Sequence, residues 1–195
     1  TKGDGLRNNL IHSILEDPAG RIWVGTALGG LCRLVPEPTP GRKVVARAYS
    51  GKDGLSTNWI NQLLQATDGN LWAGSRAGLI QFQPTADGRD FRFRLYAEAH
   101  GLNGHEVESL AEDGNGNLWV GMQPGGAAKI VRGGFTTFGK ADGFSWSTSI
   151  FDTRAGDLLV VGSPDSDTEW FINRLDAEKF VPVLPQLPDV LKTRL

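Results

Sequence analysis

Few residues in this 195-residue sequence have the type and spacing that catalysis requires. His105 and Glu106 form the one plausible acid/base pair, although neighbouring residues of a strand point to opposite faces. His12 and His100 lack metal-ligand spacing. The single cysteine, Cys32, lies in an apolar segment, which predicts a buried structural thiol. We therefore expect no catalytic residue, metal or cofactor in this segment.

Residues suited to binding are more evident. Trp59 and Trp146 lie among polar residues, and exposed aromatic rings beside polar groups suit sugars, because apolar ring faces stack while polar edges form hydrogen bonds. Packing of each tryptophan against a neighbouring loop is the alternative. Arg76 could hold a carboxylate with two parallel N–H groups, or it could be an ordinary surface arginine. The predicted ligand-binding residues are Arg7, Asn8, Trp59, Arg76, His105, Glu106, Gln123 and Trp146.

A repeated phrase predicts the elements that position these residues. The phrase has six residues: a glycine, a variable residue, and a tryptophan between two apolar residues, closed by a second glycine. It occurs at 20–25, 69–74 and 116–121, and a weaker copy without Trp spans 156–162. An Asp-Gly-Leu type of anchor precedes each copy, with glycines at 5, 54, 101 and 143. Repetition at a period of this size is typical of stacked structural units.

Each unit alternates with the period of a strand and contains turns of Asp, Asn and Gly. In the first unit we expect strands at 11–15, 22–24, 30–34 and 44–49. Four short antiparallel strands per unit of about 40–50 residues indicate a β-propeller blade. Trp23, Trp72 and Trp119 should then pack between neighbouring blades, and Asn9 and Asn58, which recur in register, should cap turns.

Composition excludes some partners. The chain has 20 basic and 22 acidic residues and a net charge of −2, so it carries no electrostatic footprint for nucleic acid. No apolar stretch approaches the roughly 20 residues of a membrane-spanning helix. The sequence begins at Thr1 and its single methionine is Met122, so we expect a piece of a longer protein.

The combined pattern, Asp-Gly-Leu-x-x-x-Asn followed by the Trp phrase and Thr, resembles the two-component regulator propeller repeat. Residues 4–26, 53–75 and 101–122 carry the pattern, and residues 142–163 carry a degenerate copy. The resemblance implies an extracytoplasmic or periplasmic bacterial sensor propeller, usually of seven blades. It also implies a second fused domain followed by a membrane-spanning histidine kinase or a nucleotide cyclase outside this segment, with glycan fragments as typical signals.

The predicted fold is therefore all-β, with four four-stranded blades of a larger, seven-bladed ring. We place the blades at about 6–50, 55–97, 102–139 and 144–184, and the tail 185–195 would begin another. Four blades alone would leave two apolar blade faces uncovered, so the remaining blades should come from the parent chain. The resemblance also allows a homodimer formed through the parent protein.

Three functions are compatible with this fold. The leading interpretation is a non-enzymatic sensor that binds a ligand, such as a carbohydrate, on one loop face and signals to a fused domain. The alternatives are a propeller enzyme, resembling streptogramin lyase or a polysaccharide-degrading lyase or hydrolase, and a scaffold for protein–protein contacts.

Overall fold

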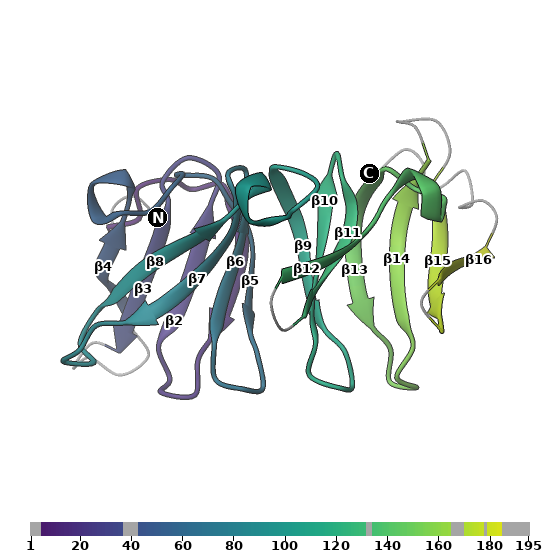
Figure 1. Cartoon of the computed structure of the whole chain (residues 1–195). Helices are drawn as coiled ribbons and strands as arrows, with labels where there is room; N and C mark the ends of the chain where they lie inside the picture. The colour runs from purple at the N-terminus through teal and green to yellow at the C-terminus, as the bar shows by residue number, and fades with distance from the viewer. Residues whose placement is uncertain (1–4, 37–42, 132–133, 165–169, 178, 185–195) are drawn as a thin grey trace. The chain divides into compact units, whose positions relative to one another are not determined.

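In the computed structural model, the residues that the structure describes form sixteen strands in four antiparallel sheets of four strands each (Figure 1). The structure describes residues 5–36, 43–131, 134–164, 170–177 and 179–184. Strands that follow one another in the chain are hydrogen-bonded neighbours within each sheet. The chain divides into two compact units, Thr1–Tyr96 and Ala97–Leu195, each with two sheets. The predicted all-β class with four-stranded blades is confirmed, and the tail 185–195 lies outside the described residues.

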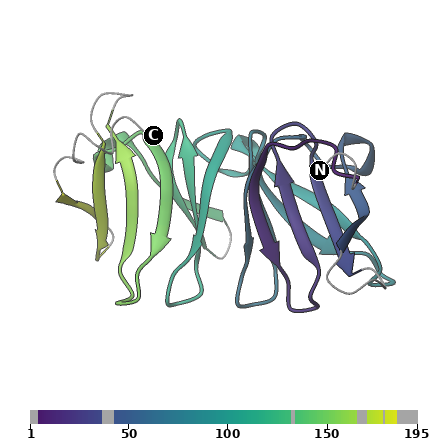
Figure 2. The ribbon, with the colours of Figure 1, turned by 180° about the vertical axis from the view of Figure 1, so that it is seen from behind.

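The first unit holds two sheets, and Figure 2 shows the purple strands of the first one from behind. The first sheet consists of β1 (Ile11–Glu16), β2 (Ile22–Thr26), β3 (Leu31–Pro36) and β4 (Lys43–Tyr49). The second sheet consists of β5 (Ile60–Gln65), β6 (Leu71–Ser75), β7 (Gly78–Pro84) and β8 (Phe91–Tyr96).

The second unit repeats this arrangement with its own pair of sheets. The third sheet consists of β9 (Glu106–Glu112), β10 (Leu118–Gln123), β11 (Gly126–Val131) and β12 (Gly134–Phe138). The fourth sheet consists of β13 (Trp146–Asp152), β14 (Leu158–Ser163), β15 (Phe171–Asp176) and β16 (Lys179–Leu184).

The tryptophans of the repeated phrase lie in the core, as the sequence predicts. Trp23 of β2 has no exposed surface, and its ring meets Phe82 and Phe91 of the second sheet edge-on at 5.3 and 5.2 Å. Trp119 of β10 is also fully buried and meets Phe180 of the fourth sheet at 6.0 Å. Edge-to-face rings fill the space between two sheets and add a specific attraction to their apolar burial. The tryptophan therefore joins adjacent sheets within each unit.

A carboxylate at the hairpin turn holds two of these indoles. Asp17 Oδ2 accepts a 2.8 Å hydrogen bond from Nε1 of Trp23, and it accepts a second from Nε of Arg21. Asp113 accepts the corresponding 2.8 Å bond from Trp119. Burial favours a raised pKa for both carboxyl groups, but these hydrogen bonds outweigh it, so each pKa lies below its ordinary value. At this place in the second sheet the residue is Ala66.

The Asp-Gly-Leu anchor is a capped turn of 3₁₀-helix that ends with a buried apolar residue. In the turn Gly51–Asp53, the Asp53 carboxylate accepts the N–H of Ser50 at 2.9 Å. Gly54 follows with φ 85°, a left-handed conformation that favours glycine, and Leu55 is 2% exposed. In the third copy Nδ1 of His100 accepts the N–H of Ala97 at 3.2 Å, which explains how histidine replaces aspartate in the anchor.

The outer face of the first sheet is apolar and uncovered. Ile14 is 64% exposed, whereas Leu63 and Leu110, at the same place in β5 and β9, are 5% and 2% exposed. Leu10, Ile11 and Leu28 of the same unit are also exposed, at 57%, 40% and 66%. The expectation of an apolar blade face without a covering blade thus agrees with the first unit.

Candidate functional site

The variable residues of the repeat face one another at the end of the first two strands of a sheet. In the first sheet the N–H of Ala27 donates to the carbonyl of Leu10 at 3.0 Å. The same bond joins Arg76 to Trp59 in the second sheet at 3.4 Å. In the third sheet Gln123 of β10 lies opposite Glu106 of β9. Four predicted binding residues therefore form two facing pairs, one pair in each unit.

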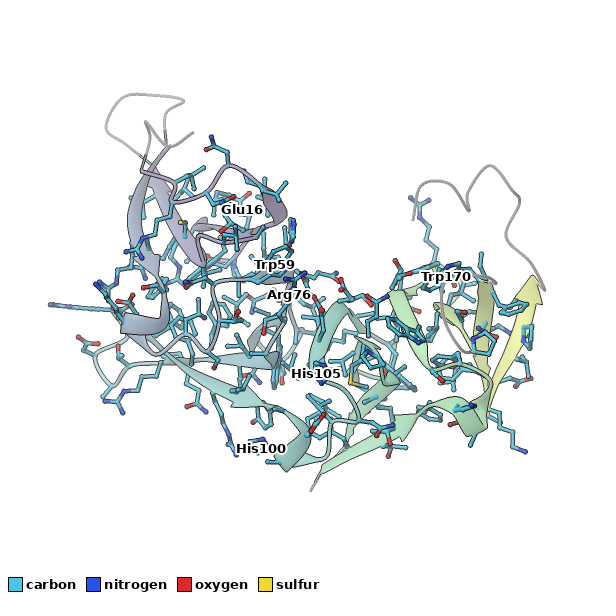
Figure 3. All side chains as sticks on the ribbon, turned by 90° about the horizontal axis from the view of Figure 1, so that it is seen from above. Glu16, Trp59, Arg76, His100, His105 and Trp170 are labelled. Carbon is cyan, nitrogen blue, oxygen red and sulfur yellow. The ribbon has the colours of Figure 1, made fainter. Side chains whose placement is uncertain are left out.

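Trp59 and Arg76 are stacked in the first unit and lie side by side when seen from above (Figure 3). The guanidinium carbon of Arg76 lies 3.5 Å from the Trp59 ring centroid. Trp59 Nε1 donates a 2.7 Å hydrogen bond to Oδ1 of Asn61, and the His12 ring meets the indole edge-on at 5.4 Å. Our expectation of an exposed Trp59 platform is wrong, because these neighbours leave the indole only partly exposed.

Sequence analysis missed the residues that surround Trp59. His12 and Asn61 are each a β-bulge in the first strand of a sheet. The pairing skips from Ile11 to Ser13 in β1 and from Ile60 to Gln62 in β5. A bulge re-aims a side chain, and here both bulge residues contact Trp59. The signal was available, because His12 and Asn61 occupy one repeat position and differ in type there.

Asn8, one of the two remaining predicted residues of the first unit, has a structural contact. The Asn8 side chain caps its turn by accepting the N–H of Leu10 at 2.7 Å, and Thr57 caps the next copy by accepting the N–H of Trp59 at 3.1 Å. The predicted capping residues, Asn9 and Asn58, each lie one position after the residue whose side chain makes the cap. Arg7 is exposed.

Cys32 is the buried thiol that the sequence predicts. It has no exposed surface and forms no disulfide. Burial raises its pKa, although the backbone N–H and the charge of Arg7 act in the opposite direction. A buried thiol with a raised pKa is a poor nucleophile at neutral pH, so this residue has a packing role.

In the second unit, the predicted acid/base neighbours separate. His105 is 66% exposed at its side chain, and its Nδ1 lies 3.4 Å from Oε1 of Glu98, which is 70% exposed. Glu106 instead begins β9 and faces Gln123. The histidine thus has Glu98 as a carboxylate neighbour, and the structure gives no support for His105 and Glu106 as an acid/base pair, in agreement with the expectation that strand neighbours point to opposite faces. Both groups of the observed pair are well solvated, which gives weak coupling.

Trp146 begins β13 and pairs with Ser163 in the ladder to β14. It is partly buried rather than fully exposed. Next to it, the hydroxyl of Ser145 donates a 2.8 Å hydrogen bond to the carbonyl of Pro164. The contacts of Trp59 with Asn61, His12 and Arg76 agree with the packing alternative for that residue, and ligand binding by Trp59 and Trp146 stays a prediction.

Among the residues that the structure describes, no three His, Cys, Asp or Glu side chains gather in a way that could hold a metal ion. Within the same residues, no helix has the length and apolar character to cross a membrane.

The fold and the variable hairpin ends define a β-propeller domain built from sequence repeats. Residues 5–27, 54–77 and 101–123 match the family model described as two component regulator propeller. The family predicted from the sequence is thus confirmed: these three segments are two-component regulator propeller repeats. No curated protein matches the chain.

Solved structures of related fold include extracellular domains of two hybrid two-component systems from B. thetaiotaomicron. The first is 22% identical with a TM-score of 0.70, and the match covers 94% of this chain and 28% of that domain. The second is 17% identical with a TM-score of 0.69, covering 91% of this chain and 25% of that domain. This chain therefore spans about a quarter of their length.

The virginiamycin B lyase of Staphylococcus aureus is also similar. It is 13% identical with a TM-score of 0.60, and the match covers 92% of this chain and 56% of the lyase. At these identities the likeness to all three structures concerns the fold alone.

Proposed function

We propose that this chain is part of an extracytoplasmic ligand-sensing propeller of a bacterial signal-transduction protein. In this proposal the propeller binds a ligand, a carbohydrate in the first instance, through the ends of its innermost hairpins. The remaining blades and a fused signalling domain, a histidine kinase or a cyclase, belong to the parent protein, and this segment has no enzymatic role of its own. The family of the three repeats and the extracellular two-component domains of similar fold support this assignment.

The observation that carries the proposal is the contrast between constant and variable positions. The Trp phrase, the anchor turn and the buried residues around them recur from sheet to sheet. The facing pair at the hairpin end does not: it is Leu10 with Ala27 in the first sheet and Trp59 with Arg76 in the second. In the third sheet it is Glu106 with Gln123. A constant scaffold with a different side-chain pair on each repeat is typical of a binding surface.

To test the proposal, the 195-residue chain is screened against a glycan library, and the affinity of each hit is measured by calorimetry. We expect saturable binding of a glycan, lost in Trp59→Leu, Arg76→Ala and Trp146→Leu with no change in the far-ultraviolet circular dichroism. Asp68→Asn, in the exposed β5–β6 turn, is the matched control and should bind normally. Unchanged affinity in all three variants would remove these hairpin ends as the binding surface.

The compartment and the signalling role need the parent protein. A reporter fusion to this segment within the parent chain should be exported if the domain is extracytoplasmic. In a reconstituted system, the glycan identified above should change kinase or cyclase output, and the Arg76→Ala variant should not respond. Turnover of that glycan by the domain itself would instead favour a lyase or hydrolase.

A further inference from the structure

The stack of Arg76 on Trp59 is unusually close for this molecule. Its 3.5 Å separation compares with 4.8–5.9 Å for the other cation–ring contacts among the described residues. At 3.5 Å the guanidinium is in van der Waals contact with the indole face. One face of the Trp59 indole is therefore already covered by Arg76, so a neutral sugar ring cannot stack on that face.

The indole that supports Arg76 is itself held in place. Its Nε1 donates to Asn61, its edge meets His12, and its backbone N–H donates to the hydroxyl of Thr57. Arg76 is tied to the same residue through the bond from its own N–H to the Trp59 carbonyl. An arginine supported in this way loses less side-chain entropy when it binds a ligand than a freely moving surface arginine loses.

Stacking on a ring does not by itself use the N–H donors of a guanidinium. Its five N–H donors lie in the plane of the group, so a ring on its face does not compete with acceptors at its edge. Arg76 is exposed and makes further contacts within the molecule, so an anion would bind through donors that these contacts leave to solvent or would replace one of the contacts. The matching acceptor is a group with two adjacent anionic oxygens, which can receive two parallel N–H bonds.

We propose that the Trp59–Arg76 stack is a subsite for the carboxylate or sulfate group of an acidic sugar. Arg76 contacts the anion, and Trp59 is a positioning residue that orients the guanidinium. The equivalent pair in the first sheet, Leu10 with Ala27, has neither a cation nor an aromatic ring, so within the first unit the subsite belongs to one sheet. This inference rests on the proposed function and names the ligand class for it.

The test follows the side-chain Nε–H signal of Arg76 and the indole signal of Trp59 by ¹⁵N NMR in the 195-residue chain. The probes are sodium glucuronate, glucose 6-sulfate and glucose, at constant ionic strength set with sodium chloride. We expect saturable shifts with at least one of the two anionic sugars and none with glucose. The anion that binds more tightly identifies the group as carboxylate or sulfate.

Variants distinguish the contributions of the Arg76 charge, of the geometry of its guanidinium and of its positioning by Trp59. Arg76→Lys keeps the charge but lacks the fork, and we expect its affinity to fall about tenfold or more. Trp59→Leu should weaken binding of the same probe, and Trp59→Phe should restore part of it because an aromatic face returns. The indole signals of Trp23 and Trp119 report whether each variant keeps its fold.

Two results would overturn the inference. Saturable binding of glucose as strong as that of the anionic sugars would show a neutral-sugar site, and the proposed sensor function would stand. Absence of saturable shifts with all three probes would remove the anion subsite. The proposed function is then decided separately by the glycan library, in which saturable binding of any glycan would leave the sensor function standing.

Discussion

The indole Nε1 of Trp23 donates a 2.8 Å hydrogen bond to Oδ2 of Asp17, which joins the core residue of the first sheet to the turn that precedes it. The carboxylate also accepts the N–H groups of Ala19 and Arg21 at 3.0 and 3.1 Å. One side chain thus shapes the turn and orients the ring between two sheets. The second unit uses Asp113 and Trp119 in the same way.

Loss of this carboxylate should destabilise the first unit. Asp17→Ala leaves the buried indole N–H without its acceptor, so we expect the free energy of unfolding at pH 7 to fall by about 1–3 kcal/mol. Urea unfolding followed by tryptophan fluorescence measures the change. Asp68→Ala is the matched control, because exposed Asp68 accepts from Asn70 in its own turn and bonds no buried ring. Equal losses in the two variants would contradict a special role for Asp17.

The same bond predicts a pH dependence of stability. The folded-state pKa of Asp17 lies below its ordinary value, so the unfolded state takes up a proton first as the pH falls. Its stabilisation is therefore complete above about pH 4, the pKa of an unfolded aspartate, and disappears as the pH falls through the folded-state pKa. Asp17→Asn should flatten the fall in unfolding free energy between pH 5 and 3 in a urea series. An unchanged slope would remove Asp17 as a contributor.

Gly25 should not tolerate a side chain. A Cβ atom built there would lie 2.6 Å from Cγ2 of Ile60 in the neighbouring sheet. We expect Gly25→Ala to cost about 1–3 kcal/mol by overpacking, and Ile60→Ala in the same chain to recover part of that loss through coupling of the two sites. Gly51→Ala, with nothing within 4 Å of its Cβ, is the control for thermal unfolding measurements. Strictly additive effects of the two changes would argue against the close contact.

Because one face of the first sheet is uncovered, side chains at equivalent positions of β1 and β5 should contribute differently to stability. Leu63→Ala should lower the unfolding free energy of this chain by about 2–5 kcal/mol, whereas Ile14→Ala should change it by less than about 0.5 kcal/mol. In a longer chain whose preceding blade covers the first sheet, Ile14→Ala should become costly too. If Ile14→Ala remains neutral there, another blade does not pack on this face.

His105 offers a test of the enzyme alternative. Its contact with Glu98 is well exposed, and exposed pairs of this kind contribute little, so His105→Ala should leave the midpoint of urea unfolding unchanged. If the domain only binds its ligand, the variant should also show the same lack of glycan turnover as the original chain. Turnover by the original chain that the variant lacks would establish a catalytic role for this histidine.

The repeat made much of this protein predictable from sequence. Trp23, Trp72 and Trp119 recur with apolar neighbours and glycines, and a large flat ring at one place in each unit has a physical use between stacked sheets. The alternation of apolar residues gave the strands, because it has the period of a pleated sheet. The burial of Cys32 was predictable from its apolar neighbours in the sequence. These features depend on local pattern, which the sequence states directly.

The candidate site depended on tertiary structure. The stack of Arg76 on Trp59 joins residues 17 positions apart, and its place results from a bulge at Asn61 and a contact with His12 of another sheet. No local pattern specifies which face of an indole a distant arginine covers, because packing between sheets decides it. The sequence alone determined the family, the blade pattern and the positions at which the repeats differ. Only the folded structure decided that two of those residues lie stacked on each other, since it alone brings the strand ends into contact.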